Sequence, residues 1–293
     1  MNHHYQRLIY KLDYYFTLIK KVILSFFIFI FLATFFLIGV CFGYFASIIS
    51  KESNINDQAL SHDVVQMPEL NTIELDNQNL IHILNQPEPL SLAGPAEVNP
   101  YVSEAVIASE DAQFYEHNGI LPKAILRAIY QDILDHHSAT GGSTITQQLV
   151  KNQLLTQDKT YQRKAKEIMY ALRIEKLFTK TEIIYIYLNI VPFGYDLHGQ
   201  HITGITSASY GIFGKSPSQL NLAESSYLAG LLQSPYYYTP FTNEGQLRSY
   251  EEVLPSIYRQ RYVLKRMYIE NQISYQQYQN ARKQNIYERI LTQ

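Results

Sequence analysis

The sequence has little cysteine and almost no net charge. One cysteine, Cys41, occurs among 293 residues, which excludes a disulfide framework and a cysteine-rich zinc site. Lys and Arg total 24 against 26 for Asp and Glu, and a pI near 6.5 gives no indication of a nucleic-acid partner. Repeats and low-complexity tracts are also lacking. Apolar residues make up 46%, so wholesale disorder is excluded, and the length allows one or two domains.

The small net charge hides an uneven distribution. Residues 51–111 contain one lysine and eleven acidic residues, whereas residues 112–293 contain nineteen basic and fourteen acidic ones. The stretch 151–180 alone has eight basic and three acidic residues. Such a local excess of positive charge suits an anionic ligand.

Residues 22–50 contain no charged side chain. As a helix they would reach about 43 Å, more than the hydrocarbon core of about 30 Å. A cleaved signal peptide is the alternative, but its apolar region is normally shorter. Because Lys20 and Lys21 precede the run, we expect a cytoplasmic tail (1–21), a transmembrane helix (22–50) that holds an inert Cys41, and an extracellular remainder. The chain is therefore predicted to cross a membrane once.

The outer part divides into a connector and a helical domain. Residues 51–99 are acidic and rich in proline, with short runs at 63–65 and 81–84 that favour strands. Residues 100–293 show helical periodicity and helix-start signals. Helices are expected at 102–109, 144–155, 162–178, from 179, from 221 to about 234, and as a C-terminal pair at 255–271 and 274–290. The prediction is a mainly α domain over 100–293.

An acidic segment begins at Glu110. If the helix continues, Glu110, Phe114 and His117 share one face, where the aromatic ring and the imidazole would tune a carboxylate for proton transfer. The alternative is a solvated acid pair near a helix that stops at Gly119. His117 alone is better explained as a structural hydrogen-bonding residue than as a metal ligand.

The second segment is Gly-Gly-Ser-Thr at 141–144, followed by a helix. Thr144 and Gln147 form a capping-box pattern, and free N–H groups at such a helix start suit an anion. Gln147 and Lys151 would share a face. An ordinary capped helix remains the alternative, and the Walker phosphate-loop pattern is absent.

Two further segments are ambiguous when taken singly. Arg163 and Glu167 have the spacing of an ordinary surface ion pair, and Thr179 with Glu182 has that of a capping box. Taken together, the four segments offer candidate carboxylates, an N–H-lined helix start and a cationic helix on an anchored outer domain. That combination suits a polyanionic lipid substrate.

In this order the segments resemble the peptidoglycan glycosyltransferase domain, glycosyltransferase family 51, found alone in monofunctional enzymes and at the N-terminal half of class A penicillin-binding proteins. The likeness covers about residues 100–240. It rests on Glu-Asp-x-x-Phe-x-x-His-x-Gly at 110–119, on Gly-Gly-Ser-Thr-Ile-Thr-Gln-Gln-Leu-x-Lys-Asn at 141–152, on Arg-Lys-x-x-Glu at 163–167, and on matches around 180–194, 213–215 and 222–235.

The resemblance implies a lysozyme-like, two-lobed helical fold close to the bilayer. It implies polymerisation of lipid II into β-1,4-linked glycan with inversion and release of undecaprenyl pyrophosphate, hence a role in cell-wall biogenesis. The expected partners are lipid II, the growing glycan and the membrane. Transpeptidases and other wall-synthesis proteins are further candidate partners. A divalent cation such as magnesium is allowed but not required.

The resemblance also assigns residues. Glu110 would be the catalytic base, with Asp111 and Glu182 as further active-site acids, and Lys151 would hold the leaving pyrophosphate. The remaining substrate-binding candidates are Lys159, Arg163, Ser143, Thr144, Gln147, Asn152 and His117. Glu182 would position the donor, bind a divalent ion or orient a basic side chain.

Departures from the family pattern leave other functions open. Leu121 stands where relatives often have an acid, and Lys159 where they often have arginine, which would weaken the grip on pyrophosphate. No Ser-x-x-Lys or Lys-Thr-Gly box follows, so we expect a monofunctional enzyme. The alternatives are a lysozyme-like glycan hydrolase and a non-catalytic membrane scaffold for wall synthesis.

Overall fold

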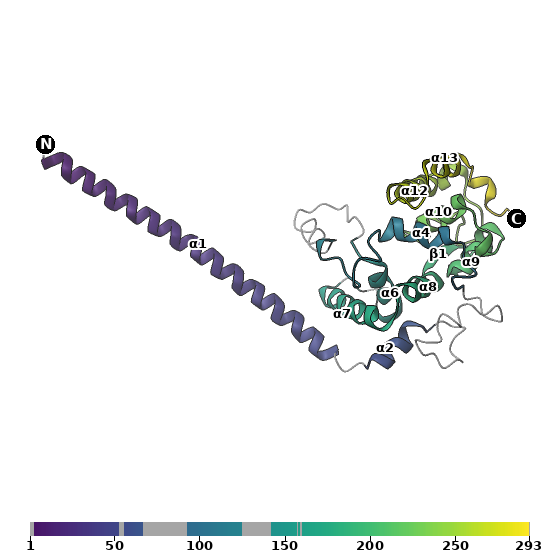
Figure 1. The fold of residues 1–293 in the computed structure, drawn as a ribbon, viewed down its shortest axis with the longest axis horizontal. Coiled ribbons are helices and arrows are strands. Elements are labelled where there is room, and N and C mark those ends of the chain that lie inside the picture. The colour runs from purple at the N-terminus through teal and green to yellow at the C-terminus, as the bar shows by residue number, and fades with distance from the viewer. Residues whose placement is uncertain are drawn as a thin grey trace. The chain divides into compact units, whose positions relative to one another are not determined.

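The computed structural model describes residues 3–52, 56–66, 93–124, 142–156, 158 and 160–292. The chain divides into two compact units, Met1–Asn54 and Ile55–Gln293. The first unit is formed by α1 (His3–Glu52), a single long helix (Figure 1). Within it, Tyr10–Ile48 is long and apolar enough to cross a membrane, as judged by length and composition.

The apolar character of α1 agrees with the predicted membrane segment, but the helix is longer than expected. It begins at His3 and ends at Glu52, so residues 3–21, which were expected to belong to a tail, are helical too. Large apolar side chains such as Phe29 and Phe36 are exposed along it. In water such a surface would be strongly unfavourable, which favours a lipid environment.

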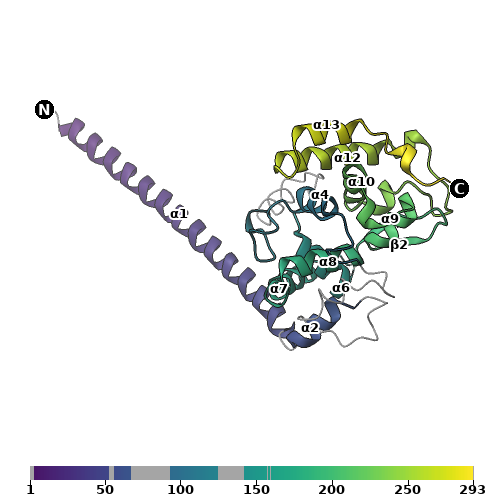
Figure 2. The same cartoon turned by 45° about the vertical axis from the view of Figure 1, so that its right-hand side comes forward.

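The second unit contains two groups of helices (Figures 1 and 2). One group, here called the α12 lobe, packs together α4 (Pro100–Glu110), α10 (Leu222–Leu231), α12 (Tyr250–Ile269) and α13 (Tyr275–Lys283). The other, the α6 lobe, packs together α2 (Asp57–Val64), α6 (Ile145–Leu154), α7 (Tyr161–Leu177) and α8 (Lys180–Ile190). The predicted mainly α fold with two lobes is confirmed.

A small hairpin region follows α8. Strands β1 (Pro192–Tyr195) and β2 (His201–Thr203) pair antiparallel, and α9 (Ile205–Phe213) follows and contacts α8. The short α11 (Pro235–Tyr238) packs on β1. Two 3-10 turns, η2 (Pro217–Gln219) and η3 (Tyr287–Arg289), complete the described elements.

Most predicted helices are confirmed, because their capping residues act as expected. Thr144, Thr179 and Asn221 each form a complete capping box with the residue three positions later. α12 begins at Tyr250, before the predicted 255, because Ser249 and Glu252 form a further capping box. α13 ends at Lys283, so the second helix of the predicted pair is shorter than expected and is followed by η3.

The predicted strand at 63–65 is wrong. Asn56 caps α2 by accepting a hydrogen bond from the Gln58 amide, and Leu60 and Val64 lie one turn apart on its buried face. Packing of α2 against α6 and α7 decides the conformation of residues 63–65, and it outweighs the preference of a three-residue pattern. The strand expected at 81–84 lies outside the described residues.

Gly119 joins the acidic segment to α6 and α7. Its φ is +89°, and a Cβ added there would lie 2.7 Å from the Ala171 carbonyl oxygen on α7. Its own carbonyl accepts a hydrogen bond from Thr144 Oγ1 at 2.6 Å. The position therefore needs a residue without a side chain, both for its backbone angle and for the close approach.

We expect Gly119→Ala to lower the free energy of unfolding by roughly 2–4 kcal/mol, because backbone strain adds to a clash with a carbonyl that cannot move aside. Thermal unfolding of the purified chain measures this effect. Gly211→Ala in α9, where the nearest atom to an added Cβ is a side-chain carbon at 3.2 Å, is the control and should change stability by less than about 1 kcal/mol. Equal effects of both substitutions would contradict the role of Gly119.

Candidate active site

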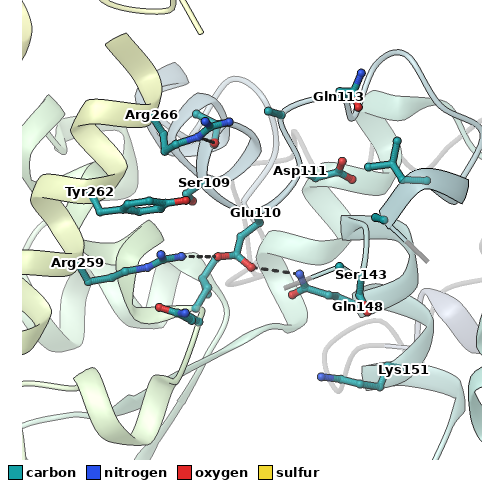
Figure 3. A pocket seen from close by; sticks show the side chains of 17 residues that line it. Ser109, Glu110, Asp111, Gln113, Ser143, Gln148, Lys151, Arg259, Tyr262 and Arg266 are labelled. Carbon is teal, nitrogen blue, oxygen red and sulfur yellow. Dashed lines mark hydrogen bonds and ion pairs between the residues drawn. The ribbon is translucent and has the colours of Figure 1, made fainter. Parts of the chain in front are cut away.

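A cleft of about 880 Å³ lies between the two lobes. The end of α4 and the residues after it form its floor, α6 contributes one wall, and α12 with the residues after α10 contributes the other (Figure 3). Glu110, Lys151 and Arg259 all line it, although they come from three separate helices.

Glu110 is the last residue of α4, and its carboxylate is held from both sides (Figure 3). Arg259 Nη2 donates to Oε1 at 3.0 Å, and Gln148 Nε2 donates to Oε2 at 3.2 Å. Only 12% of the Glu110 side chain is exposed. The carboxylate is therefore fixed in the cleft with unused acceptor capacity, as a base that receives a proton requires.

Gln148 is itself positioned by Tyr187. The Tyr187 hydroxyl donates to Gln148 Oε1 at 3.0 Å, which leaves the Gln148 amide group to face Glu110. Burial, together with the negative charge of Glu110, raises the pKa of Tyr187 well above its usual value. Tyr187 thus stays a hydroxyl donor across the physiological pH range.

Arg259 was not anticipated from the sequence. Its guanidinium lies 4.5 Å from the centroid of the Tyr262 ring, and Gly230 on α10 lets the Arg259 side chain pass closely, since a Cβ there would lie 3.2 Å from Arg259 Cγ. Arg259, Tyr262 and Arg266 line the cleft at helical spacing. That periodicity is visible in the sequence, but nothing in it indicates that this face meets Glu110.

Asp111 has a different environment from Glu110. Its side chain is fully buried, and it accepts hydrogen bonds from His117 Nε2 at 2.9 and 3.0 Å and from the Ile145 backbone amide at 3.0 Å. The anion at the start of α6 is therefore Asp111 itself. Its position favours a structural role over direct contact with substrate.

The expected helical face through Glu110, Phe114 and His117 is wrong. α4 ends at Glu110, and the next residues form turns in which Phe114 is fully buried. The chain leaves the helix because Asp111 adopts an extended φ of −156° and turns its carboxylate toward α6.

Glu182 lies in the capping box of α8. One of its oxygens accepts from the Thr179 amide at 2.6 Å and from the Thr179 hydroxyl at 2.8 Å, and the residue is 6% exposed. Glu182 does not line the cleft. This geometry favours the capping interpretation over a catalytic role.

The basic residues around the cleft divide into two kinds. Lys151 lines the cleft and makes no ion pair among the described residues. Arg163 pairs with Glu167 at 2.6 Å, and Lys164 contacts the same carboxylate and donates to Ser143 Oγ at 2.9 Å. Since Glu167 is only 2% exposed, the interpretation of this pair as solvated surface charge is wrong.

The other predicted binding residues have mostly structural positions. Ser143 lines the cleft, as does Leu121. Thr144 and Gln147 are buried in the cap of α6, Gln147 donates to Glu167, and His117 is buried against Asp111. Asn152 and Arg163 lie outside the lining. Lys159 falls outside the described residues.

A divalent ion has no evident protein site here. Among the described residues, no group of three or more His, Cys, Asp or Glu side chains has the geometry to hold a metal. The two acids at the cleft are already engaged, Glu110 by Arg259 and Asp111 by His117. The described residues form no site for a resident metal, and the expectation of a divalent cation such as magnesium stays a prediction.

Comparison with known proteins finds one matching family. The model of the transglycosylase family matches residues 77–268, which includes the floor of the cleft and its α6 and α12 walls. The match begins before residue 100, so it extends into the stretch expected to be a connector.

Individual relatives match over part of their length. The chain is 44% identical over 153 residues to penicillin-binding protein 1F of Bacillus subtilis, covering 52% of this chain and 20% of that protein. It is 37% identical to penicillin-binding protein 1A of Escherichia coli, covering 65% and 21%. It thus spans about a fifth of these relatives. A crystal structure of penicillin-binding protein 1A from Haemophilus influenzae aligns with a TM-score of 0.34 and 21% identity over 66% of this chain and 17% of that one.

We expect Asp111→Ala to lower the free energy of unfolding by about 3–5 kcal/mol, because it leaves buried His117 and the Ile145 amide without their acceptor. Glu182→Ala removes only a helix cap and should cost about 1 kcal/mol. Thermal unfolding of the two variants side by side measures the difference. A loss for Asp111→Ala no larger than that for Glu182→Ala would show that Asp111 does not hold the site together.

Proposed function

The chain belongs to the transglycosylase family, and from this premise we propose that it polymerises lipid II into β-1,4-linked glycan. The observation that carries the proposal is the Glu110 carboxylate, held by Arg259 and Gln148 in the same cleft that Lys151 lines. A base and a cation in one cleft suit the transfer of a sugar from a diphosphate to a hydroxyl.

In the proposed reaction Glu110 accepts the proton from the 4-hydroxyl of the acceptor sugar. The resulting oxygen attacks C1 of the donor sugar, the new glycosidic bond forms, and the bond from C1 to the diphosphate oxygen breaks with inversion. The electron pair leaves with the diphosphate, whose developing charge Lys151 stabilises. Because a diphosphate leaves without being protonated, one carboxylate suffices.

Arg259 and Gln148 act on Glu110 rather than on the substrate. Their donors hold both carboxylate oxygens in place. Glu110 therefore has less conformational freedom left to lose when the transition state forms. Lys164 pairs with Glu167 and donates to Ser143 at the cleft wall. This contact supports the wall of the cleft from which Lys151 projects. These contacts explain why residues distant in sequence contribute to one site.

The apolar helix α1 supports a position at the membrane. We propose that α1 anchors the chain in the bacterial cell membrane with the N-terminus in the cytoplasm, which brings the second unit to the side where lipid-linked precursors are polymerised. The proposed partners are lipid II, the growing strand and the membrane. Transpeptidases and other wall-synthesis proteins remain predicted partners.

The burial of the second carboxylate in the cleft, Asp111, disfavours the hydrolase alternative. Glycoside hydrolases typically use two carboxylates on opposite sides of the scissile bond. Among the described cleft residues these would be Glu110 and Asp111, and the Asp111 side chain is fully buried and hydrogen-bonded. Hydrolysis of preformed glycan by the purified chain would restore this alternative, and binding of lipid II without polymer would favour the scaffold alternative.

We expect Glu110→Gln to lower polymerisation of lipid II by about 10²–10⁴-fold, because an amide cannot accept the acceptor proton. A gel assay of glycan formed from lipid II, with and without magnesium, measures it. Glu116→Gln, at an exposed position on the same segment, is the matched control and should keep full activity. Full activity of a correctly folded Glu110→Gln chain would refute the proposed base.

We expect Arg259→Leu to lower kcat by about 10–100-fold with a smaller change in KM, because it releases one oxygen of the base. Arg259→Lys should recover part of the loss. Arg261→Leu is the control, since Arg261 lies on the same helix beside Tyr258 and does not line the cleft. Wild-type kcat in Arg259→Leu would exclude a positioning role.

A further inference from the structure

A second cavity of about 580 Å³ lies beside the β1–β2 hairpin. None of its lining residues lines the cleft that contains Glu110. Its walls come from β1, from α11 and the loop after it, and from the beginning of α12.

The second cavity lies on the same face of α12 as the cleft, nearer the start of the helix. Glu252 and Pro255 line the second cavity, whereas Arg259, Tyr262 and Arg266 line the cleft. Their spacing alternates between three and four residues, which places all five on one face of the helix. Pro255 and Arg259 are separated by one turn, a rise of about 6 Å.

On the opposite wall, too, one segment of the chain lines both cavities. Leu232 and Gln233, which follow α10, line the cleft, and Tyr236 and Tyr237, which come directly afterwards, line the second cavity. Two segments that are unrelated in sequence therefore run from one cavity to the other side by side. The two cavities therefore lie one after the other along the same pair of segments.

Aromatic side chains in fixed positions form the wall of this cavity. The rings of Tyr195 and Tyr236 lie 5.2 Å apart, and the Tyr236 hydroxyl is 3.1 Å from His201 Nδ1. Arg248 donates to the Tyr237 carbonyl at 2.9 Å and so holds α11 in place. Tyr237 remains 60% exposed. Rigid rings with hydroxyl groups suit pyranose sugars, which present an apolar C–H face and a rim of hydroxyls.

The charges favour sugar over phosphate. Arg248 and Glu252 are the charged residues among those that line the second cavity, and they balance each other. Lys151, the proposed diphosphate ligand, comes from α6, on the other side of Glu110 from Arg259 in the close view (Figure 3). A strand whose diphosphate end lies at Lys151 would extend its remaining sugars toward α12.

Building on the proposed function, we propose that the second cavity is a glycan subsite. It binds sugars of the growing strand that have moved beyond the reacting end, by stacking them on Tyr236 and Tyr237. Retention of the strand at this subsite lets successive lipid II units add before the strand dissociates.

The first test measures the length of the glycan made by the full chain. Tyr237→Ala, and the double variant Tyr236→Ala with Tyr237→Ala, should shorten product strands several-fold and slow elongation more than the first coupling of two lipid II molecules. Tyr275→Ala is the matched control, because Tyr275 is 58% exposed on α13 and lines neither cavity. Unchanged strand length in both variants would overturn the proposal.

The second test measures binding without turnover. Titration of the full Glu110→Gln chain with an uncharged β-1,4-linked N-acetylglucosamine tetrasaccharide should show binding that Tyr237→Ala weakens about tenfold and Tyr275→Ala leaves unchanged. Binding that Tyr237→Ala leaves intact, or binding of free stem peptide in place of the saccharide, would overturn the subsite. Tyr237-dependent binding, together with a failure of the unsubstituted chain to make polymer from lipid II, would refute the proposed function and retain the subsite.

Discussion

The buried carboxylate of Asp111 is the contact on which the arrangement of the cleft depends. It receives hydrogen bonds from His117 and from the first amide of α6, so it ties the end of α4 to the α6 lobe. Because α4 itself packs in the α12 lobe, this contact sets the distance between the two lobes. Glu110, the residue just before it, is thereby presented to both walls at once.

The acids of the unit illustrate how environment separates the roles of one residue type. Glu110 lies between Arg259 and Gln148 with part of its side chain open to the cleft. Glu182 caps the start of its own helix, α8, and Glu167 is buried under Arg163 and Lys164. Buried and saturated carboxylates stabilise the fold, whereas a carboxylate with unused acceptor capacity can exchange a proton.

Positive charge follows a similar division. Arg163 and Lys164 are held by Glu167, while Lys151 projects from α6 into the cleft. The cationic stretch seen in the sequence thus supplies both a framework and a ligand-facing group. Along the cleft the order from Lys151 to Glu110 to the Tyr262 face of α12 follows the order of diphosphate, reacting bond and sugar in the proposed substrate.

Local signals in the sequence determined the membrane-compatible apolar helix and the capping boxes at Thr144, Thr179 and Asn221, whereas Glu110 became the candidate base only through the family resemblance. The apolar helix and the capping boxes depend on neighbours within a few residues, which a sequence displays directly. Only the tertiary structure decided that α4 ends at Glu110, that Asp111 is buried, and that Arg259, about 150 residues further along, pairs with Glu110. Such outcomes depend on which helix faces pack together, and periodicity identifies a face without identifying its partner.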